Sequence, residues 1–158
     1  MKKVIVALLG LASATLLGTA SPAGAANINT AGAACHAFFA DQQASVNYLN
    51  VGMSVGESMV VQCPIPRGPL ATGATAGSFF IDGRTPASTS TTCTVVSYNF
   101  DGTMEGSISF TETNTNTVPT KFDHLVSFPA AQMSTFAYVS LACSLGAGGM
   151  IFGVTSLQ

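Results

Sequence analysis

The sequence predicts an all-β protein: an antiparallel, jelly-roll-like β-sandwich of about seven or eight strands with two disulfides. Three observations lead to this fold class. Apolar and polar residues alternate with a period of two along most of the chain, which is typical of strands that bury one face. Short segments rich in Gly, Asn, Asp and Pro separate these stretches. Four cysteines follow an N-terminal segment typical of exported chains, which indicates disulfides.

The alternating stretches define the expected strands. In the segment 136–145, for example, Leu141 and Cys143 share one side. The segment 45–55 is expected to be a single strand with Leu49 and Val51 on its apolar side. A short helix within 35–49 is the alternative to an extended start of the domain. The expected strands cover residues 45–55, 59–66, 77–83, 93–102, 105–112, 121–128, 136–145 and 149–157.

Two Asp-Gly pairs are expected to form tight hairpin turns, because Asp-Gly readily adopts the positive φ angles that such turns require. They are Asp82-Gly83 and Asp101-Gly102. The glycine-rich segment 145–150 is expected to join the last two strands. The polar segment 113–120 is expected to be a connection that ends at Pro119.

Residues 1–25 are typical of a secretory signal peptide. Lys2 and Lys3 precede an apolar run, and Ala23-Gly24-Ala25 fits cleavage after small residues. A membrane anchor is the alternative, but it needs about 20 strongly apolar residues, and this run is shorter and interrupted by small and polar residues. We expect a signal peptide at 1–25, a flexible lead-in at 26–34 and a single domain at 35–158. The mature chain would have no stable membrane span and would be secreted or periplasmic.

The four cysteines are expected to form two disulfides, because an even number in an exported chain of this size is typical of a disulfide framework. Three pairings are possible, and the sequence does not choose among them. The residues concerned are Cys35, Cys63, Cys93 and Cys143.

Cys63 also raises the possibility of a reactive thiol, because Arg67 follows it closely. A phosphate-binding loop of the phosphatase type would need five residues between the two, whereas only three are present. Pro64 and Pro66 lack the backbone N–H groups that such a loop uses. The sequence therefore favours a disulfide at Cys63, with the prolines ending its strand at an edge.

The charge distribution excludes several classes of partner. Only 8% of the residues are charged, and the segment after residue 25 carries three cationic and seven acidic side chains. Nucleic acid and anionic membranes are poor partners for such a chain, because both are bound through basic patches. An uncharged surface also gives little repulsion between copies, so self-association is possible.

Candidate catalytic residues are few. His124 is expected to share a side with Phe122 and Val126, either partly buried or at the rim of the sheet. Asp123 precedes it, but neighbours along a strand point to opposite faces and do not pair directly. No calcium-loop pattern is present.

Glu105 and Glu112 are the candidates for the paired carboxylates of a glycoside hydrolase. Solvated strand ends explain them more simply. The cysteines are not closely spaced as in zinc sites, and His36, adjacent to Cys35, is the only histidine near any of them. No catalytic, cofactor-binding or metal-binding residue is therefore assigned.

The chain resembles a loose group of small exported four-cysteine bacterial β proteins of unknown function. An early cysteine and three segments carry this resemblance: VVQCPIPR at 60–67, TTCTVVSYNFDG at 91–102 and YVSLACSL at 138–145. The resemblance implies a disulfide-bonded β domain and brings no activity or ligand. Chaperone–usher pilin subunits are also small, exported and free of Trp, but they usually have one disulfide and an aromatic last strand, whereas this chain ends GVTSLQ.

The expected function is that of an exported, non-enzymatic module that binds an unknown extracellular ligand or protein. The alternatives are a structural subunit of a surface assembly, as in pili, and an unrecognised hydrolase. Phe residues at alternating apolar positions and the absence of Trp weaken the case for a sugar-binding platform without removing it.

Overall fold

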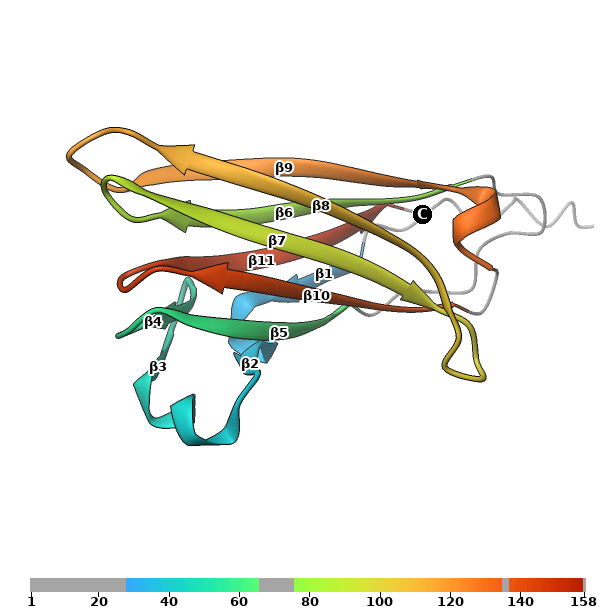
Figure 1. The fold of residues 1–158 in the computed structure, drawn as a ribbon, viewed down its shortest axis with the longest axis horizontal. Helices are drawn as coiled ribbons and strands as arrows, with labels where there is room; N and C mark the ends of the chain where they lie inside the picture. The colour runs from blue at the N-terminus through green and yellow to red at the C-terminus, as the bar shows by residue number, and fades with distance from the viewer. Residues whose placement is uncertain (1–27, 66–75, 135–136, 158) are drawn as a thin grey trace, which may run out of the picture.

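The chain folds into two antiparallel β-sheets that face one another, as seen in a computed structural model that describes residues 28–65, 76–134 and 137–157 (Figure 1). The predicted signal peptide at 1–25 lies outside the described residues. No helix in the described segments is long and apolar enough to cross a membrane.

The first sheet, sheet A, has the strand order β3-β4-β11-β6-β9, and β1 also pairs with β11. β11 thus has β6 along one side, and β4 followed by β1 along the other. The strands are β1 (Ile28–Ala31), β3 (Val46–Leu49), β4 (Gly52–Val55), β6 (Ala76–Thr85), β9 (Thr120–Pro129) and β11 (Met150–Leu157).

The second sheet, sheet B, has the order β2-β5-β10-β7-β8. Its strands are β2 (His36–Ala37), β5 (Met59–Ile65), β7 (Thr89–Tyr98), β8 (Met104–Asn114) and β10 (Tyr138–Leu145). Short 3-10 segments complete the described structure: η1 (Gly32–Ala34), η2 (Ala40–Ser45) and η3 (Ala130–Gln132).

The eight strands from β4 to β11 have the jelly-roll arrangement. They form the two four-stranded rows β4-β11-β6-β9 and β5-β10-β7-β8. Successive strands cross from one sheet to the other, except β7 and β8, which pair as a hairpin within sheet B. The predicted fold class and strand number are therefore confirmed for this part of the chain. The short strands β1, β2 and β3 are additions at its N-terminal side.

The core lies between the sheets because alternate residues of each strand point inward. Phe79 of β6 and Phe128 of β9 are almost fully buried and meet edge to face, with ring centroids 6.3 Å apart. Leu141 of β10 and Ile151 of β11 are also fully buried. Burying a side chain of this size stabilises the fold by roughly 1.5–3 kcal/mol.

The disulfides join Cys35 to Cys63 and Cys93 to Cys143. Cys93 and Cys143 are register partners on β7 and β10, so this bond crosses the middle of sheet B. Cys35 precedes β2, which pairs with β5 beside Cys63, so the other bond ties the N-terminal segment to the edge of the same sheet. Val61, Cys63 and Ile65 form the buried side of β5, as the sequence predicts.

The prediction of one strand over 45–55 is wrong, because this segment is the hairpin β3–β4. Gly52 begins β4 with a φ of 146°, a value that side-chain-bearing residues rarely adopt. A Cβ atom at Gly52 would stand 2.3 Å from the carbonyl oxygen of Ile151. The reversal leaves Leu49 and Val51 46% and 63% exposed rather than buried.

Only one of the two Asp-Gly pairs forms a turn. Asp101-Gly102 turns between β7 and β8, with a φ of 84° at Gly102. Asp82-Gly83 lies inside β6 instead, where Gly83 faces the core and a Cβ atom would stand 2.3 Å from the ring of Phe122. At this position glycine makes room for an aromatic ring, and the prediction of a turn there is wrong.

The flexible lead-in predicted at 26–34 is also wrong for the residues that the structure describes. Ile28–Ala31 forms β1 and pairs in register with Gly153–Ser156 of β11, and η1 follows directly. Of the short helix considered within 35–49, the structure contains only η2, a 3-10 segment between β2 and β3.

Candidate functional site

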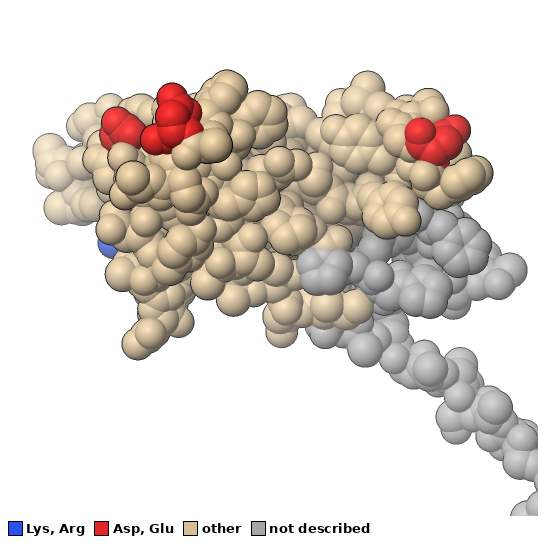
Figure 2. Space-filling model, turned by 90° about the horizontal axis from the view of Figure 1, so that it is seen from below, with Lys and Arg blue, Asp and Glu red and all other residues tan. Residues whose placement is uncertain are grey.

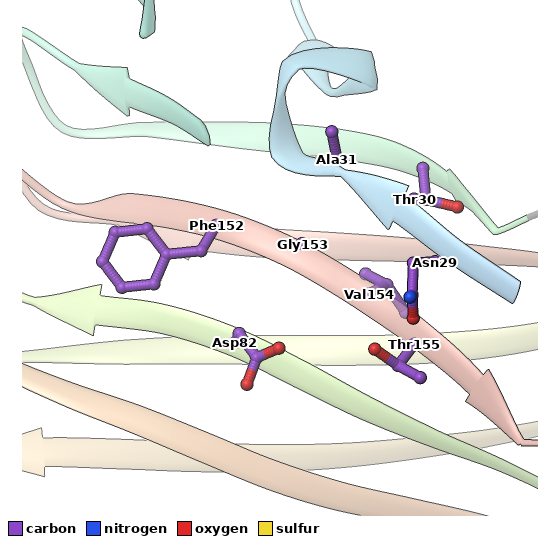
Figure 3. A pocket seen from close by; sticks show the side chains of 8 residues that line it. All are labelled: Asn29, Thr30, Ala31, Asp82, Phe152, Gly153, Val154 and Thr155. Atoms are coloured by element: carbon purple, nitrogen blue, oxygen red, sulfur yellow. The ribbon is translucent and has the colours of Figure 1, made fainter. Parts of the chain in front are cut away.

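A groove that carries polar and aromatic groups lies on the outer face of sheet A. Its volume is about 410 Å³. It opens along β1, β11 and β6, and Figure 3 shows the side chains around it. The lining residues are Asn29, Thr30, Ala31, Asp82, Phe152, Gly153, Val154 and Thr155.

A β-bulge in β11 shapes this groove. The register of β11 against β6 shifts between Ile151 and Gly153, which makes Phe152 the extra residue. Phe152 and Gly153 are therefore both partly exposed, while Ile151 and Val154 on either side are buried. A Cβ atom at Gly153 would stand 2.8 Å from the carbonyl oxygen of Thr30, so glycine at this position lets β1 lie close to β11 and contributes only backbone to the groove.

Polar side chains from three strands surround this groove. Asp82 of β6 is the register partner of Gly153, and Asn29 of β1 is the partner of Thr155 of β11. In Figure 3 the Asp82 carboxylate and the Thr155 hydroxyl turn toward one another with Asn29 beside them, while the Phe152 ring extends at the other end. The groove thus combines carboxylate, amide and hydroxyl groups with one aromatic ring.

Two rows of charge cross the same face of the sheet. Asp82 faces Asp123 of β9, and two residues further along the same strands Arg84 faces Lys121. The pKa of the Asp82 carboxyl is raised above its usual 3.8. Burial is the largest cause, followed by the charge of Asp123 and by a hydrogen bond between the two side chains. Arg84 and Lys121 are the only Lys or Arg side chains in the described segments.

Both cations have defined positions. The Arg84 guanidinium donates a hydrogen bond of 3.1 Å to the carbonyl oxygen of Gly148. The Lys121 ammonium lies 5.8 Å from the centroid of the Phe152 ring, within the range of a cation–π contact. The groove therefore has two carboxylates and two cations around it, and their formal charges cancel.

His124, the candidate catalytic histidine, lies elsewhere, where the edge strands β8 and β9 of the two sheets approach. Its Nδ1 atom is 2.7 Å from Oε1 of Glu112, and its ring stacks on Phe110 with centroids 3.8 Å apart. The two side chains are each about one third exposed. This pair links the two sheets at their open edge, which is a structural role.

Glu105 and Glu112 do not form the carboxylate pair of a glycoside hydrolase. They lie seven residues apart on β8, which corresponds to roughly 23 Å along a strand, whereas such pairs are within about 10 Å of each other. Glu105 instead accepts a hydrogen bond of 2.7 Å from the backbone N–H of Ser134.

The remaining candidates belong to the fold. All four cysteines are in disulfides, so Cys63 is not a free thiol. His36 is exposed on β2, at the edge of sheet B. Within the described residues, no group of three or more His, Cys, Asp or Glu side chains is placed to hold a metal ion.

Several large apolar side chains are exposed, and two groups of them lie far apart along the molecule. Phe38, Phe39 and Tyr48 are each about half exposed around η2, and Phe100 and Tyr138 are 75% and 67% exposed around the β7–β8 turn. Figure 1 places η2 and this turn toward opposite ends of the sandwich. In the view of Figure 2, acidic side chains also gather near the two ends, and the surface between them is largely uncharged.

No protein-family model and no curated protein matches the sequence. Among solved structures, Arthrobacter globiformis T6 isomalto-dextranase in complex with panose is similar at 13% identity and a TM-score of 0.42, over 82% of this chain and 23% of that chain. Dimeric latent PorU from Porphyromonas gingivalis is similar at 16% identity and a TM-score of 0.36, over 82% and 12%. This chain spans less than a quarter of either protein, and at these values neither similarity supports a functional conclusion.

The sequence pattern does not indicate the residues of the groove. Asp82 was expected in a turn, Asn29 in a loose lead-in, and Phe152 within a strand whose alternation gives no sign of a bulge. The signal that could have been used is the pair Phe152-Gly153, because a glycine inside a strand often marks a bulge.

Proposed function

We propose that the protein is an exported, non-enzymatic binding module and that its ligand occupies the groove on the outer face of sheet A. The observation that carries this proposal is the groove itself: a recess with one aromatic ring and polar groups from three strands. Ligand sites are typically concave surfaces with a few convergent polar groups.

The disulfides support the exported location. Both bonds lie in the sandwich, and disulfides persist in oxidising compartments outside the cytoplasm. Residues 1–25 would direct the chain there and be removed after Ala25. The mature protein would then be secreted or periplasmic.

A hydrolase is the second candidate, and the Asp82–Asp123 pair is the observation that favours it. Two interacting carboxylates with a raised pKa on one of them are a common acid–base arrangement. The pair lies on an open sheet face rather than in a closed cleft, which favours recognition of a ligand over catalysis.

A structural subunit of a surface assembly is the third candidate, and the exposed apolar ends favour it. Contact between unlike ends would bring Asp41 and Glu57 of the η2 region toward Asp101 of the β7–β8 turn, and these like charges repel. Size-exclusion chromatography and electron microscopy at low and high salt would reveal assemblies, and a monomer under both conditions would remove this candidate.

NMR spectroscopy of the mature protein tests the binding proposal. Mixtures of small organic fragments are added, and the backbone amide shifts are compared with those of Ala31→Phe, a variant that places a ring in the groove from the exposed side of β1. Ala142→Phe, on the opposite sheet, is the matched control. Shifts that cluster around Gly153 and disappear only in Ala31→Phe would support the proposal.

Fragment shifts that never include the groove would contradict it. If the protein turns over a hydrolase substrate and Asp82→Asn or His124→Ala abolishes this activity, the protein is an enzyme and not a binding module. The two variants distinguish the carboxylate pair from the histidine as the catalytic group.

A further inference from the structure

We infer that the groove binds a neutral saccharide, with an apolar face of one sugar ring on Phe152 and its hydroxyl groups on Asp82, Asn29 and Thr155. This inference rests on the proposed function, because it names the chemical class of the ligand in the same groove. It follows from the aromatic ring, the polar rim, the charge balance and the shape of the site.

The Phe152 ring provides the apolar surface. The bulge places Phe152 and Gly153 side by side on the outer face of the sheet, where both are partly exposed. A sugar ring has one face lined mainly by C–H groups, and such a face packs well on an aromatic ring. The Lys121 ammonium lies over this ring, 5.8 Å from its centroid.

The polar rim matches hydroxyl groups. A carboxylate accepts two or more hydrogen bonds, an amide both donates and accepts, and a hydroxyl does either. Asp82, Asn29 and Thr155 supply one of each from three strands. Vicinal hydroxyls of a sugar are the ligand groups that use all three kinds of partner at once.

The charge balance argues against a simple ion as the ligand. A cation would be attracted by Asp82 and Asp123 but repelled by Arg84 and Lys121, two residues away on the same strands. An anion would be attracted by the second pair and repelled by the first. The Lys121 ammonium near Phe152 would in particular repel an organic cation stacked on that ring. A neutral ligand avoids both penalties.

The shape of the groove fits a short saccharide. Its volume of about 410 Å³ is in the range of small-molecule sites, and across its width Gly153 lies between its register partners Ala31 and Asp82. The groove is open toward solvent, so a sugar unit within a longer chain could enter without the protein having to open.

The test uses the folded mature protein and three kinds of probe, followed by amide shifts in NMR titrations. The probes are a panel of neutral oligosaccharides built on glucose, galactose, mannose and N-acetylglucosamine, tetramethylammonium chloride, and sodium sulfate, all at millimolar concentrations. We expect at least one oligosaccharide to shift the amides around Gly153 and the two salts to leave them unchanged.

Two variants and two matched controls identify the contacts. Phe152→Ala should weaken saccharide binding about tenfold, and Asp82→Asn roughly ten- to hundredfold. Phe100→Ala and Asp101→Asn make the same chemical changes at the β7–β8 turn and should leave the affinity unchanged. Circular dichroism spectra matching that of the unchanged protein show that each variant is folded.

The outcomes separate this inference from the proposed function. Groove shifts with tetramethylammonium or sulfate but with no saccharide would overturn the neutral saccharide and leave the groove as a binding site. Saccharide binding that is insensitive to Phe152→Ala and Asp82→Asn would also overturn it. If none of the three probes shifts the amides of the groove, the inference is overturned. If the fragment mixtures do not shift them either, the proposed function is overturned as well.

Discussion

Removing the Cys93–Cys143 disulfide should cost the fold about 4 kcal/mol. The bond closes a segment of 50 residues, and the chain-entropy model gives about this value at 25 °C for a loop of that length. The double variant Cys93→Ala, Cys143→Ala is the suitable perturbation, because both side chains are fully buried and single variants would leave a free thiol in the core. The Cys35–Cys63 bond closes only 28 residues, and its removal should cost about 3.6 kcal/mol.

Guanidinium unfolding followed by far-ultraviolet circular dichroism measures both free energies. Domains of this size are stable by roughly 5–15 kcal/mol, so a loss of about 4 kcal/mol leaves a protein that is folded at low temperature but clearly destabilised. The slope of the transition should also increase, because an unfolded chain without the crosslink exposes more surface. A loss below about 1 kcal/mol would refute the reasoning, and so would disulfide mapping that finds Cys93 joined to any residue other than Cys143.

Three further changes have defined expected outcomes. Asp82→Asn should raise the free energy of unfolding at neutral pH by about 0.5 kcal/mol, because like charges directly opposite in a sheet repel. In thermal melts this gain should disappear as the pH falls through the raised pKa of Asp82 and below 3.8, where Asp82 is protonated in both the folded and the unfolded protein. Asn114→Ala should cost about 3 kcal/mol in denaturant unfolding, since three carbonyl oxygens lose a buried donor, and a loss under about 1 kcal/mol would show that water replaces it. Gly102→Ala should cost about 1 kcal/mol because of its φ of 84°, and an unchanged melting temperature would mean that the turn relaxes.

The alternation of apolar residues was sufficient to predict the jelly-roll part of the fold. In β10 the inward positions are occupied without interruption by Val, Leu and Cys side chains, and β7 and β11 bury Cys93, Val95, Ile151 and Val154 together with a few Ser, Thr and Met side chains. A period of two assigns such residues to one face, and strands of this length leave few other ways to bury them. The pairing of the cysteines could not be predicted, because it depends on which strands become neighbours.

Glycine was the main source of error. The same residue type reverses the chain at Gly52, fits beneath Phe122 at Gly83 and lets β1 lie close to β11 at Gly153. These roles are decided by atoms far away in the sequence, so the local pattern does not distinguish them. A turn was therefore predicted at Gly83, where the strand continues, and a strand was continued past Gly52, where it reverses.

Asn114 shows a second limit. The sequence places it at the start of a polar connection, where one Asn among several has no distinguishing feature. In the structure it is buried, and its amide donates to the carbonyl oxygens of Thr85, Pro86 and Val118. It thereby joins the end of β6 to the β8–β9 connection, which no local pattern reveals.

The candidate site was the least predictable feature, because its residues are ordinary one by one. Asp82, Asn29 and Phe152 are brought together only by the pairing of β1 and β6 with a bulged β11. Asp82 also faces Asp123 of β9, so Asp82→Asn should stabilise the fold and yet weaken ligand binding. Binding residues often carry a cost in stability that other positions do not.

The positions of β10 and β11 affect how the protein can be made. These two strands, which come last among those described, are the middle strands of sheets B and A. A growing chain that ends before Tyr138 has neither central strand, so its other strands have only partial sheets to join. Most tertiary structure must therefore form after residue 157 has emerged, and until then the exposed strand edges depend on dilution or on other proteins to prevent aggregation.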